Sequence, residues 1–165
     1  MPLRDHFRAP FTHRRSWDEI HGGWPMVIAE HLNTQLPPEY FAAPRVHLGS
    51  QYEIDVGAFD APTDEYETLI YHQDGRRLVA AIEIISPANK DRPETRNRFA
   101  TKCTALMLDE VAVILIDVVT TRRANLYADL LAQIGEHDPA IREQPPTYAA
   151  ACRWRPQGKK GRLDT

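Results

Sequence analysis

One carboxylate, Glu83, lies in an otherwise apolar stretch that spans residues 78–85. Aliphatic and β-branched runs of this length that end at turn residues, here Ser86 and Pro87, are typical of buried strands. Strict alternation puts four apolar side chains on the face opposite Glu83: Leu78, Ala80, Ile82 and Ile84. Its own face is otherwise apolar too. Because an ionised carboxylate there costs several kcal/mol unless it is paired or binds a cation, Glu83 marks either a functional site or a structural ion pair.

A second carboxylate, Asp55, lies in the middle of an extended segment over residues 52–59. An Asp-Gly turn at residues 74–75 favours a tight hairpin that joins a strand over 66–73 to the Glu83 strand. We therefore expect Asp55 and Glu83 to be neighbours in one sheet. Two carboxylates that converge on one side of a sheet can hold Mg²⁺ or Mn²⁺, with waters and a substrate phosphate completing the coordination shell.

A lysine beside such a pair would orient the attacking water and offset the charge that develops on phosphorus. Lys102 lies at the edge of the apolar face of a helix expected to begin at Pro93, so its side chain can reach the sheet. A lysine that merely packs its stem on the sheet is an alternative of equal weight. Lys90, in a mobile loop after the strand, is the second choice. Asp55, Glu83 and a lysine together predict phosphodiester hydrolysis.

Asp117 is a further carboxylate in an apolar strand, expected over residues 111–119. This strand follows a helix, which favours a parallel crossover from the Glu83 strand. Because Arg122 and Arg123 come soon after it, Asp117 is better explained as a structural ion pair or a cap than as a catalytic group.

The whole pattern predicts an α/β fold with a mixed central sheet flanked by helices. Ser16 and Glu19 match a capping box at the start of a helix, which Gly22, Gly23 and Pro25 should split. The apolar stripe of this helix consists of Trp17, Ile20, Trp24, Val27, Ile28 and Leu32. Three further elements are expected: a strand over 45–48, a helix over 125–135 that ends on a C-cap glycine, and an edge strand over 148–155.

The composition is that of a soluble globular protein, with 165 residues, 42% hydrophobic and 26% charged. No apolar run approaches the roughly 18 residues of a membrane span, and the N-terminus has no secretory pattern, so a cytoplasmic protein without a membrane partner is expected. A net charge of -3 gives no overall case for nucleic acid. Cys103 and Cys152 lack CxxC spacing, which argues against a disulfide framework and a structural zinc site.

A single domain is expected over residues 16–155. Residues 1–15 should form an extended arm that holds Phe7 and Phe11 against the body. Residues 156–165 are expected to be a basic tail, and such tails are more often solvated than functional.

Several segments resemble the bacterial family called domain of unknown function 4058. They are Trp17–His21, Leu36–Tyr40, Ile54–Ala58, Glu83–Lys90, Lys102, Leu115–Val118 and Asn125–Asp129. That family is similar to the PD-(D/E)XK restriction-endonuclease superfamily, including the Uma-two-like proteins, whose Glu-x-x-Ser-Pro segment resembles residues 83–87. The resemblance therefore implies a restriction-endonuclease-like core and a nuclease-type hydrolase.

Carried over residue by residue, the resemblance implies that Asp55 binds the metal, that Glu83 is the glutamate of the motif and that Ile84 offers a carbonyl ligand. The implied cofactor is Mg²⁺ or Mn²⁺. DNA or another nucleic acid is the implied partner.

The chain departs from that motif at Ile85, where the superfamily has its lysine. Lys102 is the better substitute and Lys90 the second. The first functional hypothesis is a metal-dependent phosphodiester hydrolase with a displaced lysine. The alternative is a catalytically inactive nuclease-fold module for binding or assembly, which the missing lysine and the negative net charge favour. A different enzyme, or a structural protein with a buried Glu83–Lys102 pair, is the third hypothesis.

Overall fold

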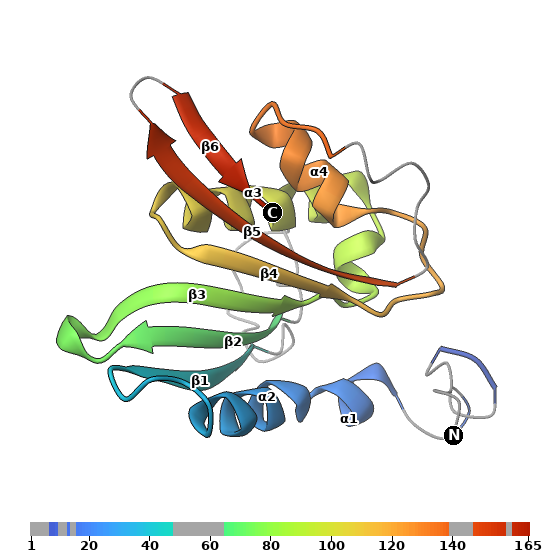
Figure 1. Cartoon of the computed structure of the whole chain (residues 1–165). Coiled ribbons are helices and arrows are strands. Elements are labelled where there is room, and N and C mark those ends of the chain that lie inside the picture. Colours follow the sequence, from blue (N-terminus) through green and yellow to red (C-terminus); the bar gives the residue numbers. More distant parts are fainter. Residues whose placement is uncertain (1–6, 10–12, 14–15, 48–64, 139–146, 158–159) are drawn as a thin grey trace, which may run out of the picture.

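The computed structural model describes residues 7–9, 13, 16–47, 65–138, 147–157 and 160–165. They form a six-stranded mixed sheet in the order β1-β2-β3-β4-β5-β6, with helices on both of its faces (Figure 1). The predicted α/β class and the mixed, helix-flanked sheet are therefore confirmed. Asp55 and the strand expected over residues 52–59 lie outside the described residues.

The described part of the chain runs from a first helix at Trp17 to a last strand that ends at Asp164. The strands are β1 Tyr40–His47, β2 Glu65–His72, β3 Arg77–Ile84, β4 Ala112–Asp117, β5 Tyr148–Gln157 and β6 Lys160–Asp164. The helices are α1 Trp17–His21, α2 Trp24–Asn33, α3 Pro93–Leu108 and α4 Leu126–Gln133, with short 3-10 helices at Asp74–Arg76 and Ala88–Lys90. The Ser16–Glu19 capping box forms, and the helix that it starts is split before Trp24, as predicted.

Strands β1, β2 and β3 form an antiparallel meander, and β4 is parallel to β3 through the crossover helix α3. The predicted Asp-Gly hairpin is confirmed, with Gly75 at a φ of 64° that a side chain would disfavour. Strand β5 pairs with β4 on one side and with β6 on the other. The prediction that the strand from residue 148 is an edge strand is therefore wrong, because part of the expected tail forms β6.

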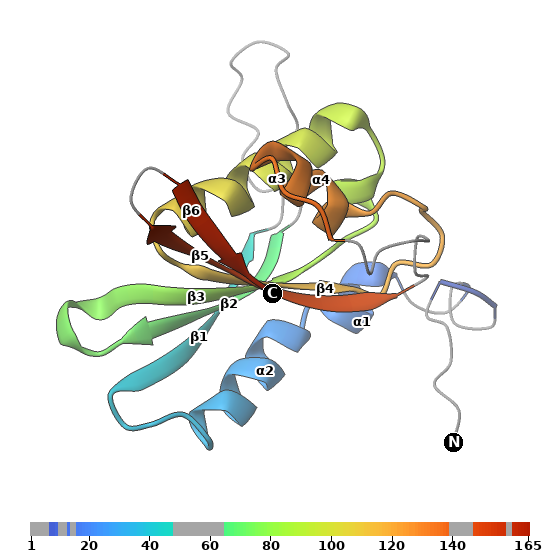
Figure 2. The same ribbon diagram turned by 45° about the horizontal axis from the view of Figure 1, so that its top comes forward.

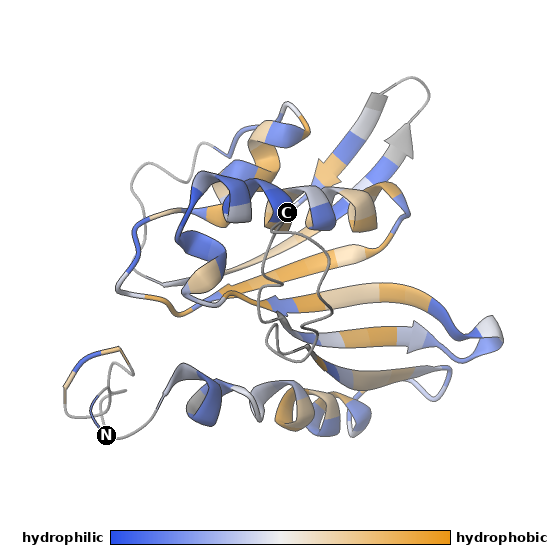
Figure 3. Cartoon of the chain, turned by 180° about the vertical axis from the view of Figure 1, so that it is seen from behind, coloured by the Kyte–Doolittle hydropathy of each residue, from blue (hydrophilic) through white to orange (hydrophobic). Residues whose placement is uncertain are grey.

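The helices divide between the two faces of the sheet, with α3 and α4 on one face and α2 against β1 and β2 on the other (Figure 2). Apolar residues concentrate on β3 and β4 (Figure 3). The main core lies beside α3 and α4 and includes Ile85, Phe99, Cys103, Met107, Leu115, Leu126 and Leu130. Val27, predicted in the apolar stripe of the first helix, is instead 62% exposed, because α2 buries Pro25 and Ala29.

A β-bulge in β3 decides which of its side chains share a face. The register shifts by one residue between the Tyr71–Leu78 and Ile70–Ala80 pairs, so the pairing skips Val79. Leu78 therefore packs on an apolar cluster beside α3, on the same face as the buried carboxylate of β3. Strict alternation, which predicted Leu78 on the opposite face, is wrong for this strand.

Candidate functional site

Two buried carboxylates lie directly across from each other on adjacent strands. Glu83 in β3 is 2% exposed, and the residue opposite it in β2 is Glu67, 1% exposed. Opposed residues in antiparallel strands point to the same face, so the two side chains meet. Glu67 is missing from the residues that the sequence singles out. The sequence does show a charged residue between Tyr66 and Thr68. Its pairing with Glu83, however, depends on the β-bulge at Val79, which shifts the register of β3 against β2.

One ammonium group bridges the two carboxylates. Lys102 Nζ donates to Glu67 Oε2 and to Glu83 Oε2, at 3.1 Å each. Helix α3 places Lys102 beside the face that buries Phe99 and Cys103, as its position at the edge of the apolar stripe predicted. The lysine side chain is 25% exposed, so the cluster reaches solvent there. The expected approach of Lys102 to the Glu83 strand is confirmed, and its role in catalysis stays a prediction.

A second cation approaches Glu67 from the neighbouring strand. Arg45 lies across from Glu67 in the β1–β2 ladder, and its Nη1 is 3.1 Å from Glu67 Oε1. The arginine side chain is 51% exposed, whereas the glutamate is buried. Glu67 therefore contacts two cations, and both of them extend toward solvent.

The two carboxyl groups differ in their affinity for protons. Burial raises the pKa of Glu83 to about 8, because loss of hydration and the nearby Glu67 outweigh the attraction of Lys102. Burial also acts to raise the pKa of Glu67, but Lys102, the Glu83 carboxyl group and Arg45 together outweigh it and hold that pKa below its usual value. Of the two carboxyl groups, Glu83 is therefore the one that holds a proton more readily near neutral pH.

The oxygen atoms of this pair fit a hard divalent cation. Mg²⁺ is commonly held by one or two carboxylates, with waters and substrate phosphates filling the remaining positions. In the described part of the chain, no three His, Cys, Asp or Glu side chains gather to form a larger ligand set. Ile84, the predicted carbonyl ligand, follows Glu83 and pairs with Tyr66 and Ile116 in the sheet. Its role stays a prediction, as does that of Asp55, which lies outside the described residues.

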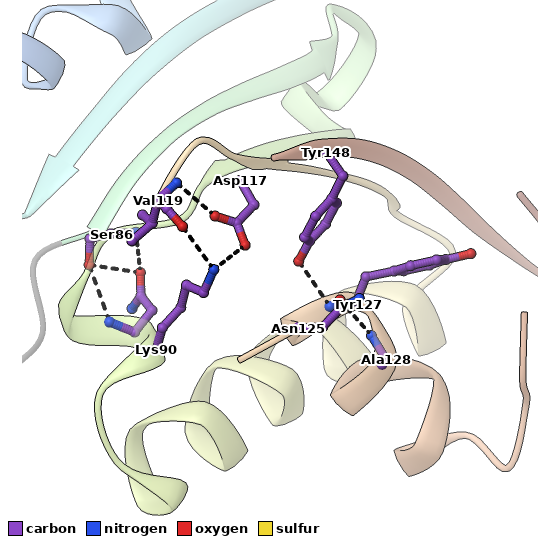
Figure 4. A network of polar contacts seen from close by, with 9 residues as sticks. Ser86, Lys90, Asp117, Val119, Asn125, Tyr127, Ala128 and Tyr148 are labelled. Carbon is purple, nitrogen blue, oxygen red and sulfur yellow. Dashed lines mark hydrogen bonds and ion pairs between the residues drawn. The ribbon is translucent and has the colours of Figure 1, made fainter. Parts of the chain in front are cut away.

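Lys90 belongs to a different cluster, shown in Figure 4. Its Nζ lies 2.8 Å from Asp117 Oδ2 and 3.2 Å from the Val119 carbonyl oxygen, and its side chain is 3% exposed. The Ser86 hydroxyl and backbone N–H both donate to Asn89 Oδ1, which fixes the short turn before the lysine. The prediction of a lysine in a mobile loop is therefore wrong. Lys90 is a buried, fixed partner of Asp117.

Asp117 serves the structural purpose predicted for it, but with another partner. Its Oδ1 accepts from the Val119 backbone N–H at 2.9 Å, while Oδ2 pairs with Lys90. Arg122, one of the two expected partners, instead pairs with Asp91 at 3.3 Å. Burial raises the pKa of Asp117 despite the lysine. The ion pair joins the 3-10 helix that follows β3 to the end of the parallel strand β4.

Comparisons with protein-family models, with curated proteins and with solved structures found no match for this chain. Among the described helices, none is both long and apolar enough to cross a membrane.

Proposed function

We propose that the protein is a divalent-metal-dependent phosphodiester hydrolase of the nuclease type, with its lysine displaced from the strand to helix α3. One observation carries the proposal: Glu67 and Glu83 are buried side by side, and the one ammonium that contacts both, Lys102, extends toward solvent. The resemblance to the PD-(D/E)XK superfamily, and membership of the related bacterial family, are part of this proposal.

Glu67 and Glu83 would hold Mg²⁺ or Mn²⁺, which would polarise a phosphoryl oxygen of the substrate. Glu83 would give up its proton when a divalent cation binds, because a second carboxylate charge would then be favourable. Lys102, on a packed helix, is held where an ammonium offsets the charge that builds on phosphorus during attack by water. Water would add to phosphorus and release one proton to solvent, the bond to the leaving oxygen would break, and that oxygen would take up a proton from solvent.

Titration of the protein with Mn²⁺ in a calorimeter tests the proposed site. Wild type should bind the ion and release a proton, which makes the measured heat depend on the ionisation enthalpy of the buffer. Glu67→Gln and Glu83→Gln should each weaken binding at least about tenfold, since each removes one of two charged ligands. Glu94→Gln, which changes an exposed carboxylate in the first turn of α3, is the matched control. Equal binding by Glu83→Gln and Glu94→Gln would contradict the site.

Cleavage is measured next, with labelled single-stranded and duplex DNA in Mn²⁺ or Mg²⁺. Wild type should cleave slowly, and Glu83→Ala should abolish cleavage. Metal-dependent activity that survives Glu83→Ala would show that the nuclease is a contaminant.

The second candidate is a nuclease-fold module that binds or assembles without catalysis. The close contact of Lys102 with both carboxylates favours it, because the ammonium already occupies the position between them. Metal binding without cleavage of any nucleic acid would support this candidate.

A further inference from the structure

The face that carries Glu67 continues along β1 and β2 to two aromatic rings, Phe41 and Tyr71, which are covered by Arg76. These three side chains are called the aromatic cluster below. Phe41 and Tyr71 lie across from each other in the β1–β2 ladder, with ring centroids 5.3 Å apart and ring planes 22° from parallel. The Arg76 guanidinium lies over both rings, 5.6 Å and 5.2 Å from their centroids. The arginine is exposed and the rings are half-buried, so the aromatic cluster is open to solvent.

The register places the aromatic cluster on the same face of the sheet as the carboxylate pair. Phe41 and Arg45 in β1 stand across from Tyr71 and Glu67 in β2, and both strands pair without interruption between these positions. Residues an even number apart in a strand share a face. At about 3.3 Å per residue, the aromatic cluster begins about 13 Å from Glu67.

Helix α3 borders the surface between the two clusters. Its Leu106 packs with Tyr71 against a shared apolar cluster, and Lys102, one turn earlier, contacts both carboxylates. A strip beside α3 thus has Lys102 and Arg45 at one end and Arg76 over the aromatic rings at the other. Positive charge combined with exposed aromatic rings is the pattern that binds the backbone and the bases of unpaired nucleic acid.

The backbone at the hairpin turn holds Arg76 over the rings at some cost. Arg76 has a φ of 51°, directly after Gly75 at 64°. A left-handed conformation is disfavoured for a residue with a side chain, and it occurs mainly at tight turns and at functional positions. At this turn the guanidinium makes an exposed cation–π contact with Phe41 and Tyr71.

We propose that this strip binds a single-stranded nucleic acid, with an unpaired base stacked on Phe41 and Tyr71 and the backbone led past Arg45 to the carboxylate pair. Arg76 gives its place over the rings to the base and pairs with the phosphate beside it. A duplex hides the faces of its bases in the stack, whereas an unpaired base offers one to an aromatic ring. The inference rests on the proposed function for what happens at the carboxylates, but the binding can be measured without hydrolysis.

The test is fluorescence anisotropy of a short labelled oligothymidylate, at low salt and in EDTA so that no cleavage occurs. Phe41→Leu and Tyr71→Leu should each weaken binding about tenfold, because they keep the apolar volume and remove a stacking ring. Tyr40→Leu is the matched control. Tyr40 precedes Phe41 in β1 and lies on the opposite face of the sheet, where its ring centroid is 5.1 Å from that of His72. Replacing Tyr40 should leave the affinity unchanged.

The contribution of charge is tested by Arg76→Gln. This variant should bind more weakly, and the slope of log binding constant against log salt concentration should decrease in size by about one. Arg77→Gln should change neither the affinity nor this slope. Tyr71→Trp keeps a ring at the site and should retain binding, which guards against a Tyr71→Leu variant that fails to fold. Equal affinity for single strand and duplex, equal loss in the Tyr40→Leu control, or no binding by wild type would each overturn the inference.

The same variants separate this inference from the proposed hydrolysis. Binding that depends on the aromatic cluster, in a protein that cleaves nothing in Mn²⁺, supports the strip and contradicts the hydrolase. Cleavage that is unaffected by loss of Phe41 and Tyr71 supports the hydrolase and overturns the strip.

Discussion

Replacing Glu83 with glutamine should make the metal-free protein more stable near neutral pH. Burial raises the pKa of Glu83 to about 8 in the folded protein, against an ordinary value of 4.5. The folded state therefore binds this proton more tightly than the unfolded chain. The resulting stabilisation is complete below about pH 4.5 and is lost as the pH rises through about 8. Glutamine resembles the protonated carboxyl in shape and cannot ionise, so the variant should keep this stabilisation as the pH rises.

The size of the effect follows from the two pKa values. At about 1.4 kcal/mol per pH unit, the gap between them amounts to about 5 kcal/mol. At pH 7, where the unfolded glutamate is almost fully ionised, about 3 kcal/mol of this has been lost in the wild type. Glu67 acts in the opposite sense, because its lowered pKa gives stability that is present at neutral pH and lost on acidification. The wild type should therefore be most stable in mildly acidic solution.

Urea unfolding in EDTA, followed by tryptophan fluorescence, gives the free energy of unfolding from about pH 5 to about pH 8. The wild-type value should fall across this range, and that of Glu83→Gln should stay nearly level. Glu94→Gln should keep the wild-type slope. Parallel curves for wild type and Glu83→Gln would contradict a raised pKa of Glu83. A variant that is much less stable at neutral pH would show that Glu83 is ionised in a structural ion pair.

Three further outcomes are expected. Lys90→Ala should lower the free energy of unfolding by about 3–5 kcal/mol, since it leaves Asp117 charged and buried, whereas Arg122→Ala on the exposed Asp91 pair should cost less than about 1 kcal/mol in the same urea assay. Lys102→Ala should lower the cleavage rate per folded molecule more than Lys90→Ala, and the reverse order would contradict the assignment of Lys102. The rise in melting temperature on adding Mn²⁺ should grow as the pH rises toward about 8, where Glu83 ionises, and an effect that shrinks would contradict the site.

The architecture could be predicted because its signals are local. The capping box at Ser16, the turn at residues 74–75 and the helix start at Pro93 each depend on residues close in sequence, and each forms as expected. The apolar run of β4 after a helix was sufficient to predict that β4 is parallel to β3. The prediction that residues 148–155 form the edge strand of the sheet was wrong because residues 160–164 have only a weak tendency to form a strand. Pairing with β5 stabilises them as strand β6.

The composition of the site depends on contacts that local patterns do not contain. A hairpin continued from its turn without a bulge would pair Glu83 with Tyr66 and put Glu67 on the other face, so skipping Val79 creates the carboxylate pair. Lys90 has the sequence context of a loop, and only its burial against Asp117 shows that it is fixed. In both cases the tertiary neighbours, rather than the residue's own segment, decide its role.

The two buried clusters differ in a way that bears on function. Lys90 and Asp117 are one cation and one anion, both enclosed, with backbone groups completing their hydrogen bonds. That arrangement is complete as a structural ion pair. The Lys102 cluster instead brings two carboxyl groups together at the solvent-reaching end of one lysine, and burial raises the pKa of one of them, Glu83, to about 8. With Arg45 as a second partner of Glu67, the cluster holds two cations and two carboxyl groups beside solvent, and both carboxyl groups would serve a divalent cation.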